Sequence, residues 1–341
     1  MSEVAFQRLL NAIPSLPPVQ LAELATAVRA RIVAASAPAL APAQVAALEP
    51  AGTAPLPLAS VAGSTIATIE VRFAGAPQCP HCKSASIKRW GSANALKRYR
   101  CKDCKATFNA LTGTPLAQLH RRELWDRHAG ALLEGISLRK AAARLGIDLT
   151  TSFRWRHRFL EAIKSMQPKM LQGTVEADET YFLHSQKGSR HLGRPARKRG
   201  GKASKRGLSD EQVPVLIARD RDKATADRIL KDRSERSIAG LLGPLVADGS
   251  VLVSDGARAY RAFADKARIP HVGLVLSKGE WTWGIYHVQN VNAYTSQLKK
   301  WMRRFNGVAT KYLDSYLGSH RMNDREGNTL TANRIFIAAM G

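Results

Sequence analysis

Acidic residues are scarce in this chain of 341 residues, with 27 Asp and Glu against 52 Lys and Arg and a formal net charge of +25. Such an excess of one sign opposes compaction unless a polyanion offsets it, so nucleic acid is the leading partner. Residues 1–75 hold four basic and four acidic side chains, and the net charge therefore lies entirely beyond residue 75. A hydrophobic share of 45% allows sizeable cores and excludes a wholly disordered basic tail.

Long apolar runs are missing too. The longest uncharged stretch, Pro50–Ile69, is interrupted by prolines and glycines and is unsuited to span a membrane. The first three residues, Met-Ser-Glu, lack the basic and apolar blocks of a signal peptide. We therefore expect a soluble, cytosolic protein without a membrane partner.

Cysteine is limited to four residues, which form the two CxxC pairs Cys79/Cys82 and Cys101/Cys104 with eighteen residues between them. In a reducing compartment such pairs indicate a metal site rather than disulfides. Four thiolates satisfy the tetrahedral preference of Zn²⁺ and leave no open coordination position, so the predicted zinc is structural. Four buried structural or redox thiols are the alternative interpretation.

The chain length favours several folding units. The expected segments are a helical N-terminal element (1–32), an Ala/Pro-rich linker (33–75), a zinc ribbon (76–114), a helix-turn-helix domain (115–170), a mixed α/β domain (171–320) with a basic insertion (187–206), and a C-terminal tail (321–341). Within the α/β domain, strands are predicted at 174–182, 213–219, 251–254 and 272–276, and helices at 237–246, 257–267 and 287–305.

The segment 137–159 is typical of a helix-turn-helix. Ser137 can cap a short Ala-rich helix, Gly146 suits a left-handed turn, and a second, Arg-rich helix follows. Many such helix pairs only pack against other helices, and that alternative stays open. The predicted DNA-binding residues are Lys88, Arg89, Arg98 and Arg100 of the ribbon, Arg154, Arg156 and Arg158 of the second helix, Lys198 and Arg199 of the basic insertion, and Arg303.

Carboxylates stand at the predicted strand ends. The strand pattern of 174–182 places Glu176 and Asp178 on one face and Glu179 on the other. Asp255 follows the short apolar run 251–254 and precedes Gly256, which permits a tight turn. Asp178 and Asp255, brought together by neighbouring strands, could hold divalent ions about 4 Å apart for displacement at phosphorus. The alternative is that each aspartate only caps a turn.

The predicted helix 287–305 has one apolar and one polar face. The apolar stripe comprises Val291, Tyr294, Leu298, Trp301, Met302 and Phe305, which repeat at helical spacing. The polar face contains Asn292, Ser296, Lys299 and Arg303 and could point toward the two aspartates and a DNA phosphate. A merely solvated face is the alternative interpretation.

Together these motifs resemble those of bacterial insertion-sequence transposases of the ISXO type, insertion sequence family 1595. The matching features are the two CxxC pairs, the helix-turn-helix and the segments 175–182, 253–260, 287–299 and 305–313. The resemblance implies a multidomain protein whose α/β domain is an RNase H-like, DDE-type catalytic domain that cuts and joins DNA at terminal inverted repeats with Mg²⁺ or Mn²⁺. We accordingly expect double-stranded DNA as partner, both element ends and target DNA, a homo-oligomer on DNA, and association with the bacterial nucleoid.

The resemblance also assigns the catalytic residues. Asp178 and Asp255 match the first two acidic residues of the DDE triad, Asn292 matches the third, and Lys299 matches the lysine seven residues later. Asn292 departs from the acidic pattern, although the 36 residues that separate it from Asp255 suit the triad. Asp178, Asp255 and Asn292 are thus the expected ligands of the catalytic metal, and Glu280 is the fallback for the third.

Two functions follow. The favoured one is a DNA transposase that binds inverted repeats and catalyses metal-dependent cleavage and strand transfer. The alternative is a domesticated or inactive transposase that acts as a DNA-binding regulator, and the neutral Asn292 is the feature that supports it. A Mg²⁺-dependent nicking assay separates the two.

Overall fold

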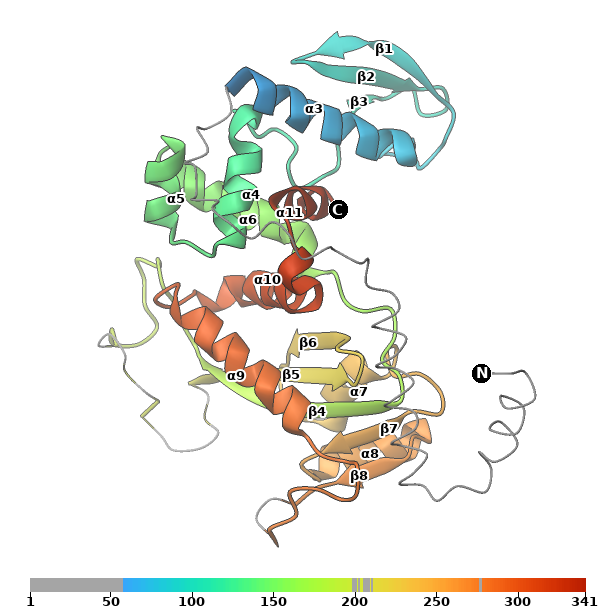
Figure 1. Ribbon diagram of the computed structural model, residues 1–341, viewed down its shortest axis with the longest axis vertical. Helices are drawn as coiled ribbons and strands as arrows, with labels where there is room; N and C mark the ends of the chain where they lie inside the picture. The colour runs from blue at the N-terminus through green and yellow to red at the C-terminus, as the bar shows by residue number, and fades with distance from the viewer. Residues whose placement is uncertain (1–57, 198–200, 202, 205–208, 210, 276–277) are drawn as a thin grey trace, which may run out of the picture. The chain divides into compact units, whose positions relative to one another are not determined.

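A computed structural model describes residues 58–197, 201, 203–204, 209, 211–275 and 278–341 (Figure 1). The predicted N-terminal element at 1–32 and the linker up to residue 57 lie outside the described residues. Lys198 and Arg199 also lie outside them.

Residues 58–75 are not a linker, and that prediction is wrong. Leu58–Gly75 forms helix α3, with Ile69 fully buried and Ile66 and Phe73 packed beside it at helical spacing. The ring of Phe73 lies 4.7 Å from that of Tyr99, measured between centroids. The Ala- and Pro-rich composition concealed this helix, because the prolines end at Pro57 and the apolar repeat begins only after them.

A small antiparallel sheet follows, with strands β1 (Ile87–Ala93), β2 (Leu96–Cys101) and β3 (Thr107–Asn109) in that order. Cys79, Cys101 and Phe108 form its own core, against which Phe73 and Tyr99 pack. Strand β1 is exposed along almost its whole length. This module lies within the range predicted for the zinc ribbon.

Three helices succeed a 3₁₀ turn at Arg122–Leu124: α4 (Trp125–Leu133), α5 (Leu138–Leu145) and α6 (Leu149–Lys164). The Ser137 hydroxyl accepts the N–H of Lys140, which caps α5. Gly146 ends α5 in the left-handed conformation, with φ 60°. The local signals for a helix, a turn and a second helix are therefore present as the sequence predicted.

The last residues are a folded part of the core, not a tail, and that prediction is also wrong. After a 3₁₀ turn at Thr310–Tyr312, helix α10 (Leu313–Glu326) is followed by a second such turn (Gly327–Thr329) and by α11 (Ala332–Ala339). Phe336 of α11 is buried, 6.0 Å from Trp125 and 6.3 Å from Phe159 between ring centroids. At Gly318, a Cβ would lie 2.6 Å from the Cα of Lys164, so glycine permits the close crossing of α10 and α6.

The second sheet is mixed and has five strands in the order β6-β5-β4-β7-β8. The strands are β4 (Thr174–Leu183), β5 (Gln212–Asp220), β6 (Thr225–Ile229), β7 (Val251–Ser254) and β8 (His271–Gly273). Strand β5 runs antiparallel to β4 and β6, whereas β4, β7 and β8 are parallel. Strand β6 escaped prediction because it carries charged residues, of which Asp227 is buried in an ion pair with Arg321.

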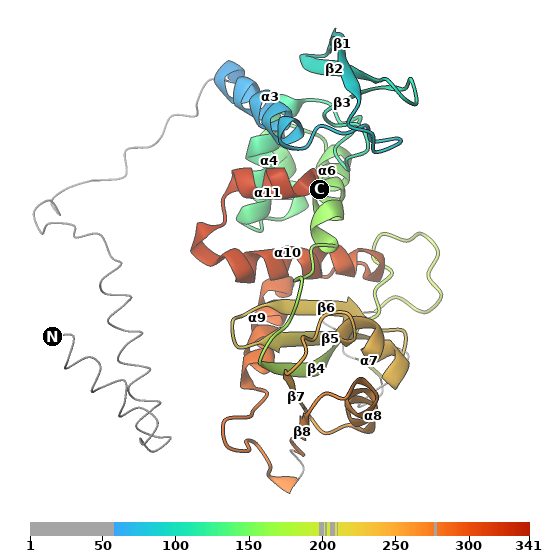
Figure 2. The same cartoon turned by 90° about the vertical axis from the view of Figure 1, so that its right-hand side faces the viewer.

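Helices cover both faces of this sheet (Figures 1 and 2). Helices α7 (Glu235–Leu242) and α8 (Arg258–Ala267) share a core with one face, and α9 (Gln289–Arg303) and α10 share a core with the other. The predicted stripe of α9 is confirmed at Val291, Tyr294, Leu298 and Trp301, which are all buried. Among the described residues, no helix combines the length and the apolarity that crossing a bilayer requires.

Candidate active site

The register of two parallel strands brings Asp178 and Asp255 to the same level. Glu176 of β4 pairs with Val253 of β7. Two residues further along in each of these segments, Asp178 therefore stands beside Asp255. Gly256 turns the chain after β7 with φ +78°, as its sequence position predicted. The site therefore lies where β7 ends beside the middle of β4.

Three carboxylates converge there. Oxygen atoms of Asp178, Glu179 and Asp255 all lie within 4.8 Å of one another. One oxygen of Asp178 accepts the N–H of Glu179 at 2.8 Å, and one of Asp255 accepts the N–H of Ala257 at 3.0 Å. The turn-capping alternative is thus correct for Asp255 as well, since the same carboxylate caps its turn and contributes to the cluster.

Burial and like charges act on these carboxyls. Burial raises the pKa of Asp178 to about 6; the Glu179 N–H opposes the rise, Glu179 and Asp255 add to it, and Lys299 opposes it. Neighbouring carboxylates repel one another, and this repulsion raises the pKa of one of them. A bound cation is favourable at such a site because its charge compensates the repulsion.

Glu179 was predicted on the opposite face of β4 from Asp178, and its membership of the cluster was not predicted. It does lie on the face covered by α8, where its carboxylate pairs with Arg233 at 3.3 Å and adjoins Tyr260. Burial raises its pKa, while Tyr260 and Arg233 oppose that rise. Strand alternation alone could not reveal Glu179, because Asp255 stands at a strand end that both faces of β4 can reach.

Glu176 anchors α9 instead of joining the cluster. Its fully buried carboxylate accepts the backbone N–H groups of Asn290 and Val291 at 2.8 and 3.0 Å and the side-chain amide of Asn290 at 2.9 Å. Arg221 lies 3.3 Å from the same carboxylate. A carboxylate at a helix N-terminus satisfies otherwise unpaired N–H groups and complements the helix dipole. This contact fixes the start of α9 relative to β4.

Asn292 and Lys299 lie on the exposed side of α9, two turns apart. Lys299 is close enough to Asp178 to lower the pKa of that carboxyl by electrostatic attraction, against the larger effect of burial. Glu280, the fallback third ligand, has its carboxylate bound to the N–H of Val275 at 3.1 Å. The acidic group that adjoins the two aspartates is Glu179, not Glu280.

The four cysteines also come together as predicted. Their sulfur atoms lie within 4.8 Å of one another, with Cys79–Cys104 and Cys82–Cys101 both at 3.6 Å. A tetrahedral ion with Zn–S bonds of about 2.3 Å separates its sulfurs by about 3.8 Å, whereas a disulfide requires about 2.05 Å. The arrangement fits one structural zinc ion and excludes disulfides.

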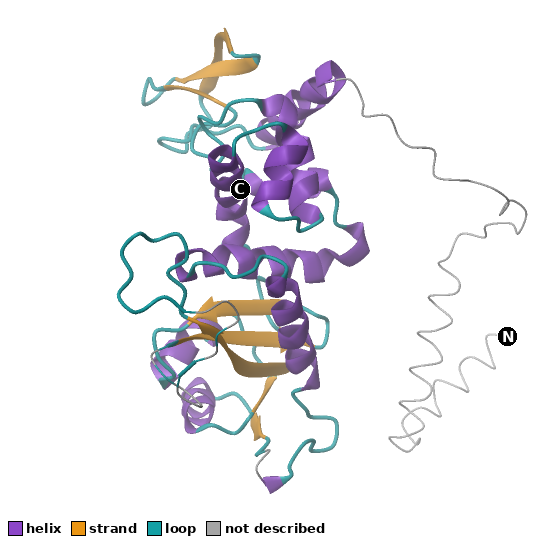
Figure 3. Cartoon of the chain, turned by 90° about the vertical axis from the view of Figure 1, so that its left-hand side faces the viewer, coloured by secondary structure: helices purple, strands orange, loops and turns teal. Residues whose placement is uncertain are grey.

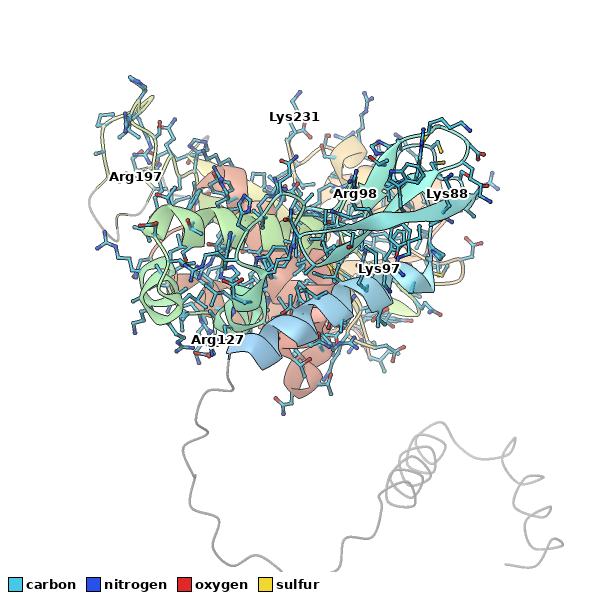
Figure 4. The ribbon with its side chains drawn as sticks, turned by 90° about the horizontal axis from the view of Figure 1, so that it is seen from above. Lys88, Lys97, Arg98, Arg127, Arg197 and Lys231 are labelled. Atoms are coloured by element: carbon cyan, nitrogen blue, oxygen red, sulfur yellow. The ribbon has the colours of Figure 1, made fainter. Side chains whose placement is uncertain are left out.

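Some of the predicted DNA-binding residues are exposed, whereas others bind backbone carbonyls of the protein itself. Lys88 is exposed on β1 and Arg98 is half-buried on β2 (both labelled in Figure 4), and Lys88 and Arg100 each lie 4.9 Å from the ring centroid of Trp90. Arg154 and Arg303 are exposed. Arg156 is only 2% exposed and donates to the carbonyl of Ile136 at 2.6 Å, so its prediction as a DNA contact is wrong. Arg158 is half-buried and donates to the carbonyls of Pro115 and Ala117.

Arg156 and Arg158 were misassigned because α6 packs on several sides at once. Helices α4, α5 and α11 contribute to the core on one side of α6, and α10 crosses another. Arginine side chains on such a helix bind backbone carbonyls that would otherwise lack donors. An alternation of Arg with aromatic residues does not distinguish this role from contact with phosphate.

Comparison with known proteins gives the family. Residues 170–321 match the profile of the ISXO2-like transposase domain. A chain described as an uncharacterized protein in transposable element ISH50 of Halobacterium salinarum is 29% identical over 259 residues, which are 74% of this chain and 87% of that protein.

Two solved structures show weaker similarity. The simian T-cell lymphotropic virus intasome in complex with PP2A regulatory subunit B56 gamma matches 56% of this chain and 66% of its own, slightly under two thirds, at 10% identity and TM-score 0.27. The Mos1 transposase paired-end complex with the left transposon end matches 59% of this chain and 75% of its own, at 13% identity and TM-score 0.20. The family resemblance rests on the sequence match: residues 170–321 match the ISXO2-like transposase domain, and the resemblance to insertion sequence family 1595 is confirmed.

Proposed function

We propose that this protein is a DNA transposase that binds the terminal inverted repeats of an insertion sequence and catalyses their metal-dependent cleavage and strand transfer. The observation that carries the proposal is the convergence of Asp178, Glu179 and Asp255 at the ends of adjacent parallel strands within a transposase-family domain. The strand order supports an RNase H-like fold for this domain, with three antiparallel strands followed by two parallel ones.

The carboxylates suit Mg²⁺ or Mn²⁺, because both are hard cations that prefer oxygen ligands. Asp178 and Asp255 would hold the ion, and the adjoining Glu179 adds negative charge. When bound, the metal supplies Lewis-acid activation of water and of the scissile phosphate. Asn292 would add a neutral oxygen ligand from α9, whose start is fixed by Glu176.

The chain's residues position two displacements at phosphorus. In the first, a water oxygen forms a bond to the phosphorus at the element end while the bond to the 3′ oxygen breaks, and that oxygen takes up a proton. In the second, the freed 3′ hydroxyl attacks a target phosphate, loses its proton and displaces another 3′ oxygen. In each step Asp178 and Asp255 take up the proton that the attacking oxygen loses and the leaving 3′ oxygen takes up a proton, while Lys299 holds a non-bridging phosphate oxygen.

DNA binding is proposed for two modules. The ribbon at 76–114 presents Lys88, Arg89, Arg98 and Arg100, and the helix pair α5–α6 within 115–170 acts as a helix-turn-helix through exposed residues such as Arg154. The basic insertion at 187–206, the homo-oligomer on DNA and the association with the bacterial nucleoid complete the proposal. Zinc would stabilise the ribbon and take no part in the chemistry.

The test is cleavage of linear DNA carrying the cognate inverted repeats. The wild-type protein should nick this DNA in Mg²⁺ but not in EDTA, and Asp178→Ala and Asp255→Ala should abolish nicking. Asp248→Ala is the matched control, because Asp248 is an exposed residue in the turn before β7. Full DNA binding without any nicking by the wild-type protein would favour the regulator instead.

A further inference from the structure

A cavity of about 880 Å³ lies between the end of β4 and α9. One side is formed by residues 181–189 and by the described part of the basic insertion, which is drawn as a loop in Figure 3. The other side is formed by Lys299, Met302 and Arg303 of α9 and by residues 306–313.

The described part of the loop is fixed to the α9 side. Ser185 and Thr310 exchange hydrogen bonds, with the Ser185 N–H donating to the Thr310 hydroxyl at 2.8 Å and the Thr310 N–H donating to the Ser185 carbonyl at 2.9 Å. The Lys187 ammonium donates to the carbonyls of Asn306 and Gly307 at 3.1 and 2.7 Å. Arg197, labelled in Figure 4, donates to the carbonyl of His184 at 2.8 Å. These bonds give the cavity a preformed wall.

The lining combines an apolar floor with a cationic rim. Apolar side chains of the floor are Phe182, Met302, Val308 and Leu313, and Leu192, which is 44% exposed, adds an apolar side chain from the loop. Lys299 and Arg303 stand on the rim, and their charged groups have no hydrogen-bond acceptor among the described residues. An apolar floor suits the face of a nucleobase, and free cations suit the phosphate attached to it.

Two residues belong to both the cavity and the surroundings of the acidic cluster. Tyr181 lines the cavity and follows Glu179 by two residues in β4, so the two side chains stand on the same face of the sheet. Lys299 lines the cavity and attracts Asp178. A strand whose phosphate sits at the carboxylates therefore has its neighbouring nucleotide at the cavity mouth.

We propose that this cavity binds a single unpaired nucleotide of the DNA strand next to the phosphate that is attacked, with its base on the apolar floor and its phosphate on Arg303. The inference rests on the proposed function. Extrusion of one nucleotide costs unpairing energy, which stacking in a pocket offsets, and it frees the adjacent phosphate from the double helix.

The experiment compares the affinity of the full-length zinc-loaded protein for two fluorescent 30-base-pair duplexes at one salt concentration without Mg²⁺. One duplex is fully paired and the other has one extra unpaired thymidine at its centre. The wild-type protein should bind the bulged duplex about tenfold more tightly, the effect expected for one stacked base. Met302→Trp fills the cavity and should remove this preference without weakening binding to the paired duplex.

A second pair of variants guards against misfolding of Met302→Trp. Arg303→Gln and Lys300→Gln each remove one exposed cation of α9, but only Arg303 lines the cavity. Both variants should lose the same affinity for paired DNA through counterion release, and only Arg303→Gln should also lose preference for the bulge. Equal affinity of the wild-type protein for both duplexes overturns the inference, as does an unchanged preference in both Met302→Trp and Arg303→Gln.

The outcome also separates this inference from the proposed function. If the wild-type protein nicks cognate ends in Mg²⁺ but has no preference for the bulge, the nucleotide site is wrong and the transposase proposal stands. If the protein binds neither duplex and nicks no DNA, both are wrong.

Discussion

Asn292 is the one neutral group among the predicted metal ligands, and its substitution tests the chemistry at the residue scale. Asn292→Ala should cut the cleavage rate severely, whereas Asn292→Asp should retain activity with a lower Mg²⁺ requirement, since a carboxylate binds Mg²⁺ more tightly than an amide. The measurement is the Mg²⁺ dependence of end cleavage, with Ser296→Ala as the control one turn further along the same face.

Should Asn292→Ala cleave like the wild-type protein at every metal concentration, the third ligand must be another group. Glu179 is then the candidate, because its carboxylate already adjoins Asp178 and Asp255. Glu179→Gln would in that case raise the Mg²⁺ requirement, while Arg233→Gln, which removes only the partner of Glu179, would not.

The same residues show how far the sequence could predict the site. Asp178 and Asp255 were identifiable because a strand pattern and a following glycine are local signals. Glu179 was not, since its approach to Asp255 depends on how β7 ends beside β4. The burial of Arg156 depends on helices that are distant in sequence, and no local pattern records that packing.

At the scale of elements, the folding of the ribbon should depend on zinc, because its own core comprises only three buried residues, Cys79, Cys101 and Phe108. Cys101→Ser should release zinc and weaken DNA binding while the five-stranded sheet stays folded. Because Phe73 of α3 packs on Tyr99 of the ribbon, we also expect α3 to loosen together with the ribbon. Elemental analysis and hydrogen exchange would check this, and a purified wild-type protein without zinc would contradict it.

The last helix allows a matched pair of substitutions. Phe336 is 1% exposed against Trp125 and Phe159, whereas the next residue, Ile337, is 41% exposed. Phe336→Ala should destabilise the protein by about 3–5 kcal/mol through loss of buried contacts and the remaining cavity. Ile337→Ala should cost about 0.5 kcal/mol or less. Urea unfolding would measure both, and equal effects would mean that α11 does not complete the helical core.

Strands and helices were predicted well where one face of an element is buried and the other is polar, as in α9. The prediction failed for β6, α3 and α11, each for a physical reason. Asp227 in β6 is neutralised by Arg321 from far along the chain, and the apolar residues of α3 and α11 are buried only by partners that the sequence does not name.

At the scale of the whole molecule, the net charge of +25 should make DNA affinity fall steeply with salt, as Lys and Arg release condensed counterions. Neutralising the nine Lys and Arg of residues 187–206 should reduce the slope of log affinity against log salt without changing sequence preference. Titrations from about 50 to 200 mM salt would check this, and an affinity that does not respond to salt would contradict it.

Stability should fall as the pH drops from 7 to 5, because three histidines are held neutral in the folded protein. Burial lowers the pKa of His128 to about 3 and those of His157 and His320 to about 4. His128 is fully buried between Trp155 and Phe159, and neither ring nitrogen has a partner among the described residues. The unfolded chain takes up these protons below pH 6.5 and the folded chain does not, so this stability is complete above pH 6.5 and is lost as the pH falls.

Asp178 acts in the opposite direction. Its folded pKa of about 6 lies above the ordinary 3.8, so the folded protein binds that proton first and gains stability as the pH falls through 6. This one carboxyl offsets part of the stability that the three histidines lose. The neutral state of His128 alone should lower the free energy of unfolding by about 2 kcal/mol at pH 5. His128→Phe keeps an aromatic ring in the core and should remove that share of the loss, whereas His191→Phe, at an exposed position, should leave it unchanged. Urea unfolding at pH 7 and pH 5 decides the matter: an equal loss of stability in His128→Phe and the wild-type protein would show that His128 is not the group that takes up the proton.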